Sequence, residues 1–271
     1  MSLKPLILAF AAAGAASAAH AGEARCWIDQ GVVVVAAQVA GVAGDYILDT
    51  GQARTVLADT RAQGAGFTAT RIAGDVRLAG LSLPAQPVSV EKIDVRTGLF
   101  PTPIAGVLGA DLLRGHVLDV RFAPCRIGLY RPGRTPPFAA SRRLRLESLA
   151  GLPAVAAAVS DGPRARAGRF VLATGSDTPV RLSDAAARAP GAPKPREVYP
   201  YGVARPRLRA LSFAGALHQN LPSGLLTTGA ADELGEIGAP LLAHYRLRFD
   251  FPRGRLELAP ATKKAPGMPG P

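Results

Sequence analysis

The residues best suited to chemistry are Asp49, Thr50 and Gly51, which directly follow the apolar run from Tyr46 to Leu48. An apolar run of this kind indicates a buried strand. A carboxylate at the end of such a strand is costly unless it is hydrogen-bonded or used. Gly51 lets the chain turn sharply, so that backbone N–H groups can approach the carboxylate. An ordinary strand-ending turn also explains a triplet this short.

Three later segments extend the pattern. They are the segments 106–113, 170–176 and 235–242. From Asp49 to Gly109 is 109 − 49 = 60 positions, and from Ala173 to Gly238 is 238 − 173 = 65 positions. Two matched pairs of motifs at nearly equal spacing indicate an internal repeat.

These segments resemble the retropepsin-like and pepsin-like aspartic peptidases, which include bacterial aspartyl proteases. In that family an apolar-apolar-Asp-Thr-Gly strand precedes an apolar-apolar-Gly segment that packs beneath the Asp loop. The resemblance covers roughly residues 27–260 as a doubled domain. It implies an all-β, two-lobed acid-protease fold with a short helix after each apolar-apolar-Gly segment.

Composition along the chain supplies the remaining boundaries. Lys4, the apolar run to Ala16 and the small residues Ala19 and Ala21 predict a secretory signal peptide. A proline-containing basic stretch predicts a linker, and the Pro/Gly/Lys-rich end predicts a disordered tail. We therefore expect a signal peptide at 1–21, a first lobe at 22–134, a linker at 135–143, a second lobe at 144–260 and a tail at 261–271.

Two cysteines, Cys26 and Cys125, are present in the whole chain. In an exported protein an even count of two suggests one disulfide, whereas two unpaired thiols are the alternative. We expect a bacterial periplasmic protein, with extracellular release as the alternative.

The chemistry of aspartic peptidases needs two carboxylates about 3 Å apart that share one proton. The resemblance assigns Asp49 to catalysis. It assigns Thr50, Gly51, Thr174 and Gly175 to the support of the active loops. Ala173 stands where the second aspartate is expected, so the second lobe is degenerate.

Three readings of Ala173 remain open. The protein could have lost catalysis and bind peptides between its lobes. Glu236 could replace the missing acid, because it occupies the position that Val107 holds in the first repeat. The favoured alternative is that it points away or pairs with an arginine, because a buried unpaired glutamate is costly. An active homodimer of Asp49 lobes is disfavoured, because the tandem second lobe already fills that surface.

The resemblance also suggests residues that contact a peptide. Asp177 lies four positions after Ala173, where retropepsins carry an aspartate that binds the peptide main chain. The family places its flap in residues 66–95, where turns are expected at Ala73–Gly74 and at Gly80. The corresponding residues of the second repeat are Tyr199 and Tyr201.

Other classes of function find little support. The formal charge of +12 comes from scattered or loop residues without interleaved aromatics, which does not favour nucleic acid. The histidines of the chain are scattered along the sequence, at positions 20, 116, 218 and 244, so no metal or other cofactor is expected. We expect a monomer without stable membrane insertion after signal cleavage. Its partner would be a peptide or protein, either hydrolysed by water that Asp49 activates or only bound.

Overall fold

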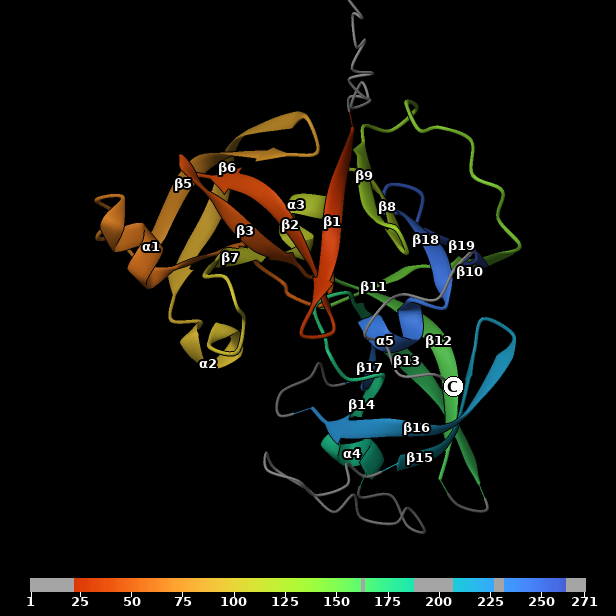
Figure 1. Cartoon of the computed structure of the whole chain (residues 1–271). Helices are drawn as coiled ribbons and strands as arrows, with labels where there is room; N and C mark the ends of the chain where they lie inside the picture. Colours follow the sequence, from red (N-terminus) through yellow and green to blue (C-terminus); the bar gives the residue numbers. More distant parts are fainter. Residues whose placement is uncertain (1–21, 162–163, 188–206, 227–231, 262–271) are drawn as a thin grey trace, which may run out of the picture.

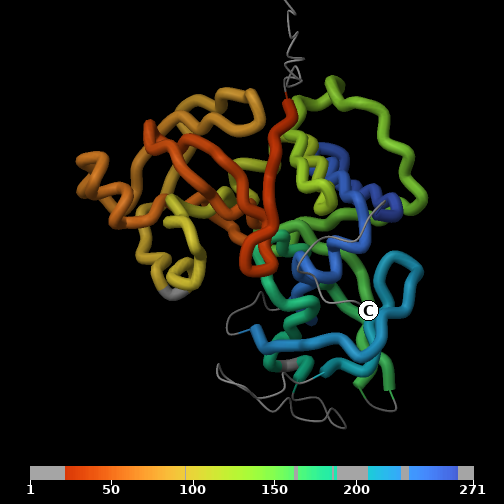
Figure 2. Tube along the Cα trace, viewed as in Figure 1, coloured from red at the N-terminus to blue at the C-terminus, as the bar shows by residue number. Residues whose placement is uncertain are grey.

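The computed structural model describes residues 22–161, 164–187, 207–226 and 232–261. In this part the chain is almost entirely β-structure and forms two lobes (Figure 1). The first lobe lies to the left in Figure 1 and the second lies below it, while the trace in Figure 2 follows the chain from one to the other. The expectation of an all-β, two-lobed fold is confirmed.

The first lobe has the strand order β1-β2-β3-β7-β4-β6-β5, and β2 also pairs with β5, which closes the sheet on itself. Its strands are β1 (Glu23–Asp29), β2 (Val32–Val39), β3 (Val42–Leu48), β4 (Val56–Ala58), β5 (Arg71–Leu78), β6 (Leu81–Glu91) and β7 (Ile104–Leu108). Strands β3 and β7 run parallel, and β4 lies antiparallel to β7. This pairing brings the end of the Asp49 strand beside the predicted apolar-apolar-Gly segment.

The second lobe repeats this order as β11-β12-β13-β17-β14-β16-β15, and the additional pairing of β12 with β15 matches that of β2 with β5. Its strands are β11 (Glu147–Leu149), β12 (Leu152–Ser160), β13 (Ala165–Ala173), β14 (Val180–Leu182), β15 (Arg207–Phe213), β16 (Ala216–Leu225) and β17 (Glu233–Gly238). The two halves of the chain therefore share one topology.

Five further strands continue the sheet of the first lobe beyond β1. They are β8 (Val117–Phe122), β9 (Cys125–Tyr130), β10 (Arg142–Arg145), β18 (Tyr245–Asp250) and β19 (Arg255–Pro260). Strand β8 of the first half pairs antiparallel with β18 of the second, and β9 pairs with β1. These pairings extend the sheet of the first lobe to twelve strands within the described residues.

The helices of the described residues are short. They are α1 (Asp59–Gly64), α2 (Asp94–Thr97), α3 (Ala110–Leu113), α4 (Asp184–Ala187) and α5 (Ala239–Leu242). Helices α3 and α5 follow β7 and β17, as the sequence predicts. In the described part of the chain, no helix has the length and apolar character needed to cross a bilayer.

Alternation along the strands separates two apolar clusters. In β3, Tyr46 and Leu48 face the main core, whereas Ile47 faces a smaller cluster on the other side of the sheet. The smaller cluster consists of Val32, Val34, Ile47, Val56, Ile104 and Val107. Ile93 and Phe100, which flank α2, pack against it. Thus α2 is held over one face of the sheet of the first lobe.

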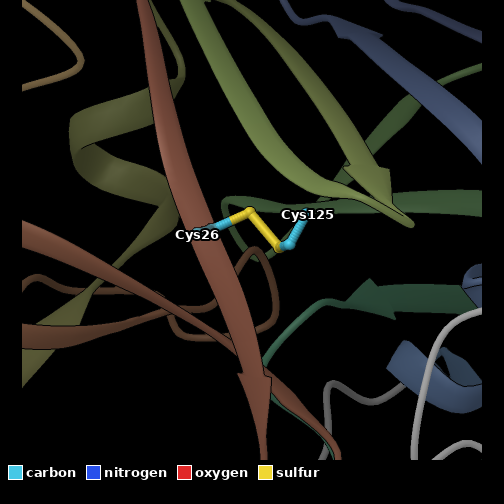
Figure 3. The surroundings of a disulfide bond; sticks show 2 residues. All are labelled: Cys26 and Cys125. Atoms are coloured by element: carbon cyan, nitrogen blue, oxygen red, sulfur yellow. A yellow bond between two sulfur atoms is a disulfide. The ribbon is translucent and has the colours of Figure 1, made fainter.

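The predicted disulfide between Cys26 and Cys125 is confirmed, and it joins β1 to β9 (Figure 3). The expectation of a turn at Ala73 and Gly74 is wrong. Both residues lie inside β5. The turn expected at Gly80 is confirmed, because the β5–β6 hairpin turns at Ala79 and Gly80. A side chain at Gly74 would collide with Ala40, so this glycine permits close packing rather than a turn.

Candidate active site

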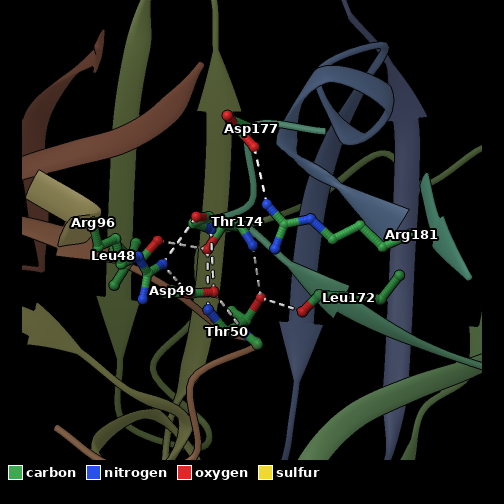
Figure 4. Close-up of polar contacts among 10 residues, drawn as sticks. Leu48, Asp49, Thr50, Arg96, Leu172, Thr174, Asp177 and Arg181 are labelled. Carbon is green, nitrogen blue, oxygen red and sulfur yellow. Dashed lines mark hydrogen bonds and ion pairs between the residues drawn. The ribbon is translucent and has the colours of Figure 1, made fainter. Parts of the chain in front are cut away.

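Thr50 and Thr174 join the two lobes through four buried hydrogen bonds (Figure 4). The Thr50 hydroxyl donates to the Leu172 carbonyl at 2.5 Å, and the Thr174 hydroxyl donates to the Leu48 carbonyl at 2.7 Å. Each hydroxyl also accepts a hydrogen bond from the backbone N–H of the other threonine, at 3.1 and 3.2 Å. The two loops are thereby fixed about an approximate twofold axis.

Asp49 lies at this axis with 5% of its surface exposed. Its Oδ1 accepts hydrogen bonds from the backbone N–H groups of Gly51, at 2.8 Å, and Gly175, at 3.2 Å. A Cβ atom at Gly175 would lie 2.5 Å from the Asp49 Cβ, so only glycine leaves room for this carboxylate. Both lobes therefore hold one oxygen of Asp49.

Ala173 occupies the mirror-related position in the second lobe. It is buried, and a Cβ atom at Gly51 would lie 2.5 Å from the Ala173 Cβ, which repeats the contact between Gly175 and Asp49. The backbone of a two-aspartate site is thus present, but only one of its two positions carries a carboxylate.

Arg96, on α2, binds the other oxygen of Asp49. Its Nη2 donates a hydrogen bond to Asp49 Oδ2 and a second one, of 2.9 Å, to the Gly175 carbonyl (Figure 4). The exposed fraction of the Arg96 side chain is 34%, whereas that of the Asp49 side chain is 7%. This guanidinium therefore lies between the Asp49 carboxylate and solvent.

No motif in the sequence points to Arg96. Ion pairs carry no spacing rule when their partners lie 47 residues apart. The signal that could have pointed to it is a basic residue between the predicted flap strands and the apolar-apolar-Gly segment, at the position where the chain returns to the Asp loop.

Glu236, the candidate second acid, lies on β17, opposite Val171 of β13 and Arg181 of β14. Burial raises the pKa of Glu236 above its ordinary value, the nearby Ser176 hydroxyl opposes this, and the negative charge of Asp49 raises it further. Its Oε1 is buried and has no hydrogen-bond partner among the described residues. Glu236 is therefore close enough to Asp49 to sense its charge.

Asp177 lies at the rim of the second-lobe loop and forms an ion pair of 3.0 Å with Arg181 (Figure 4). Gly31, in the turn between β1 and β2, packs against Asp177. Asp177 is therefore positioned on the same side of the active loops as the first-lobe hairpin.

The structure does not show the other residues proposed to contact a peptide at this site. Ala73 and Gly74 lie within the β5–β6 ladder, opposite Pro87 and Gln86. Tyr199 and Tyr201 fall outside the described residues.

Two of the histidines lie closer together than their sequence positions suggest. The ring centroids of His218 and His244 are 5.9 Å apart, and His218 Nε2 is 3.3 Å from the Tyr245 hydroxyl. Among the described residues no group of three or more His, Cys, Asp or Glu side chains is arranged to hold a metal ion.

Comparison with known proteins supports the fold. No protein-family model matches the chain, and no curated protein matches it by sequence. Among solved structures, the chain is similar to the crystal structure of aspartic proteinase from Irpex lacteus, with a TM-score of 0.57 and 13% sequence identity. The match covers 92% of this chain and 99% of that chain. The chain thus has the fold of a pepsin-like aspartic proteinase.

Proposed function

We propose that this protein is an exported binding module for peptides or proteins, built on the acid-proteinase fold and without hydrolytic activity. Two observations on Asp49 carry the proposal. Its counterpart in the second lobe is Ala173, and its Oδ2 atom is bound by Arg96. Aspartic-peptidase chemistry requires a pair of carboxylates that share a proton. A guanidinium stays protonated and cannot exchange that proton with a substrate.

The preserved loops support a binding role. The cross-lobe bonds of Thr50 and Thr174 and the two glycine contacts keep the space between the lobes in the geometry of a two-aspartate site. A peptide in this space would meet Arg96 and Arg181, whose side chains are about one third exposed. These groups can bind main-chain carbonyls without catalysis.

Hydrolysis with Glu236 as the second acid is the competing function, and one observation favours it. Burial and the charge of Asp49 raise the pKa of Glu236, so Glu236 can hold a proton under conditions in which an ordinary carboxylate has lost it. In this alternative Arg96 must leave Asp49 before a water molecule can approach.

The deciding experiment incubates the mature protein with a diverse peptide pool from roughly pH 3 to 7, the range in which a shared-proton pair operates. Mass spectrometry then measures both cleaved products and retained peptides. We expect retained but intact peptides at every pH. Cleavage that is absent in Asp49→Ala would overturn the proposal, and loss of that cleavage in Glu236→Gln would establish the competing function.

The disulfide supports a location outside the cytoplasm. A bond between Cys26 and Cys125 suggests an oxidising environment outside the cytoplasm. We propose a periplasmic or secreted monomer. Cell fractionation and light scattering on the purified protein test these two properties.

A further inference from the structure

The two lobes present different chemistry on equivalent faces of their sheets. In the first lobe, laterally paired residues form an apolar row of Trp27, Val34, Ile47, Val107 and Val56. In the second lobe, the equivalent row consists of Glu147, Ala154, Val171, Glu236 and Arg181. Residues paired in this way point to the same face of a sheet. The row that is wholly apolar in the first lobe therefore carries three charged side chains in the second, beside the buried Ala154 and Val171.

Glu236 is the charged residue of this row that has no ion pair among the described residues. Arg181 lies directly opposite it, but Arg181 forms an ion pair of 3.0 Å with Asp177. Arg169 likewise pairs with Asp232, at 2.8 Å. The Oε1 atom of Glu236 and the Oγ atom of Ser176 are both buried without a hydrogen-bond partner among the described residues.

An unpaired carboxylate in this setting is costly to the fold. Ser176 is only 5% exposed and follows Thr174 and Gly175 in the second active loop. Its hydroxyl lies close enough to Glu236 to influence that carboxylate. The loop and β17 thus place the Ser176 hydroxyl and the Glu236 carboxylate together, close enough to Asp49 for its charge to act on Glu236.

We propose that Glu236, assisted by Ser176, binds the cationic side chain of a lysine or arginine in the peptide held between the lobes. This inference rests on the proposed function and names its ligand class. A carboxylate forms its strongest hydrogen bonds with a charged donor. An anionic ligand group is not favoured, because the nearest guanidiniums, those of Arg96 and Arg181, already bind Asp49 and Asp177.

Binding of a cation changes the protonation of Glu236. In the free protein, burial and the charges of Asp49 and Glu233 raise the pKa of Glu236, while Ser176 and Arg181 lower it. An adjacent ammonium or guanidinium favours the charged carboxylate and so lowers this pKa. Ligand binding therefore releases a proton, and affinity for the cationic peptide falls as the pH is lowered through the pKa of the free protein.

The test uses a matched pair of peptides taken from the retained pool, with either lysine or uncharged norleucine at one position. Isothermal titration calorimetry measures their affinities for the wild type, for Glu236→Gln and for Glu147→Gln, a control in the same row. We expect the wild type and the control to prefer lysine by about tenfold or more, a factor typical of one charge-assisted contact. In Glu236→Gln the two peptides should bind equally.

Titrations in two buffers of different ionisation enthalpy report proton release. Release should accompany lysine-peptide binding to the wild type and disappear in Glu236→Gln. Equal affinity of the wild type for each peptide of every pair, at each position scanned, overturns the inference and leaves the proposed function standing. Failure of the wild type to retain any peptide overturns the proposed function itself. Because the wild-type comparison stands alone, the test remains decisive even if a variant unfolds.

Discussion

The two active loops share their backbone bonds and differ in their side chains. Thr50 and Thr174 make equivalent bonds across the lobe boundary, yet Asp49 has only Ala173 as its counterpart. The residues common to both lobes are those that hold the loops together. The residues that differ are those that would react with or recognise a ligand. The fold can therefore persist while its chemistry changes in one half.

The lobes also differ in how each loop is supported. In the first lobe, the Asp111 carboxylate accepts hydrogen bonds from the Thr55 N–H at 3.0 Å and the Thr55 hydroxyl at 2.8 Å. In the second lobe Pro240 stands at the position equivalent to Asp111, and Gly238 donates instead to the Pro179 carbonyl at 3.0 Å. The intact loop thus has a side-chain support that the degenerate loop lacks.

The largest expected effect comes from making the loops alike. Ala173→Asp combined with Arg96→Met would supply a second carboxylate and free the first. Since the Gly51 and Gly175 contacts are already symmetric, the pair should share a proton. We expect peptide cleavage to rise from background by at least about 100-fold, at the low end of what a positioned acid–base group contributes.

Mass spectrometry with the same peptide pool measures this gain. Ala173→Asn with Arg96→Met is the matched control, because an amide has the shape of a carboxylate but cannot act as the acid or base. A folded double variant that stays inactive would show that the space between the lobes no longer admits a scissile bond.

Removal of the disulfide should give the largest change in stability. Both of its cysteines lie in the first half of the chain. It closes a loop of 99 residues. Replacing both cysteines by serine should lower the free energy of unfolding by about 4 kcal/mol in the chain-entropy model. Fluorescence of Trp27, the single tryptophan, reports on β1 during denaturant unfolding. An unchanged midpoint would mean that the β1–β9 pairing alone holds this edge.

Removing the cross-lobe hydroxyls tests whether the two lobes contribute equally. Thr50→Val and Thr174→Val each leave a buried carbonyl and a buried N–H without a partner. We expect each to cost about 2–3 kcal/mol and the double variant to depart from the sum, because the two threonines belong to one network of contacting residues. Chemical denaturation measures all three. Strongly unequal single effects would contradict the symmetry of the pair.

The smallest expected effect concerns hairpin turns that occur in both lobes. Ala40 and Ala79 in the first half and Ala150 and Ala214 in the second have positive φ values near 50°, and each precedes a glycine with positive φ. Asparagine tolerates this conformation better than alanine. At Ala150, which is exposed, the change to Asn should raise the free energy of unfolding by about 0.5 kcal/mol, whereas Ala79 and Ala214 are buried and would not tolerate the larger polar side chain. Thermal unfolding measures the gain, and Ala36→Asn, at an exposed strand position, is the control that should lower stability.

Much of the fold could be predicted because its signals are local or repeated. The paired motifs around Asp49 and Ala173, the helices after each apolar-apolar-Gly segment and the two cysteines all fall within this class. The turn at Gly74 was predicted wrongly because the sequence does not distinguish a glycine that turns the chain from one that permits the close packing of a neighbouring residue. Only the contact with Ala40 separates the two cases.

The candidate site could be predicted only in part. Its backbone groups belong to a motif, so the sequence places them together. Arg96 reaches Asp49 because Ile93 and Phe100 anchor α2 on the small apolar cluster, and no pattern in the sequence encodes that distance. Side chains that arrive from a different segment have to be seen in three dimensions.

The pairing of β8 with β18 also determines how the molecule can deform. Residues 117–120 pair antiparallel with residues 247–250, and Arg248 donates two hydrogen bonds of 2.6 and 2.7 Å to the Asp119 carboxylate. The two halves are thus joined through one continuous β-sheet and not by a flexible linker alone. A protease that nicks the chain between β9 and β10 would leave two fragments that stay associated. Any opening between the lobes must be a twist of this shared sheet.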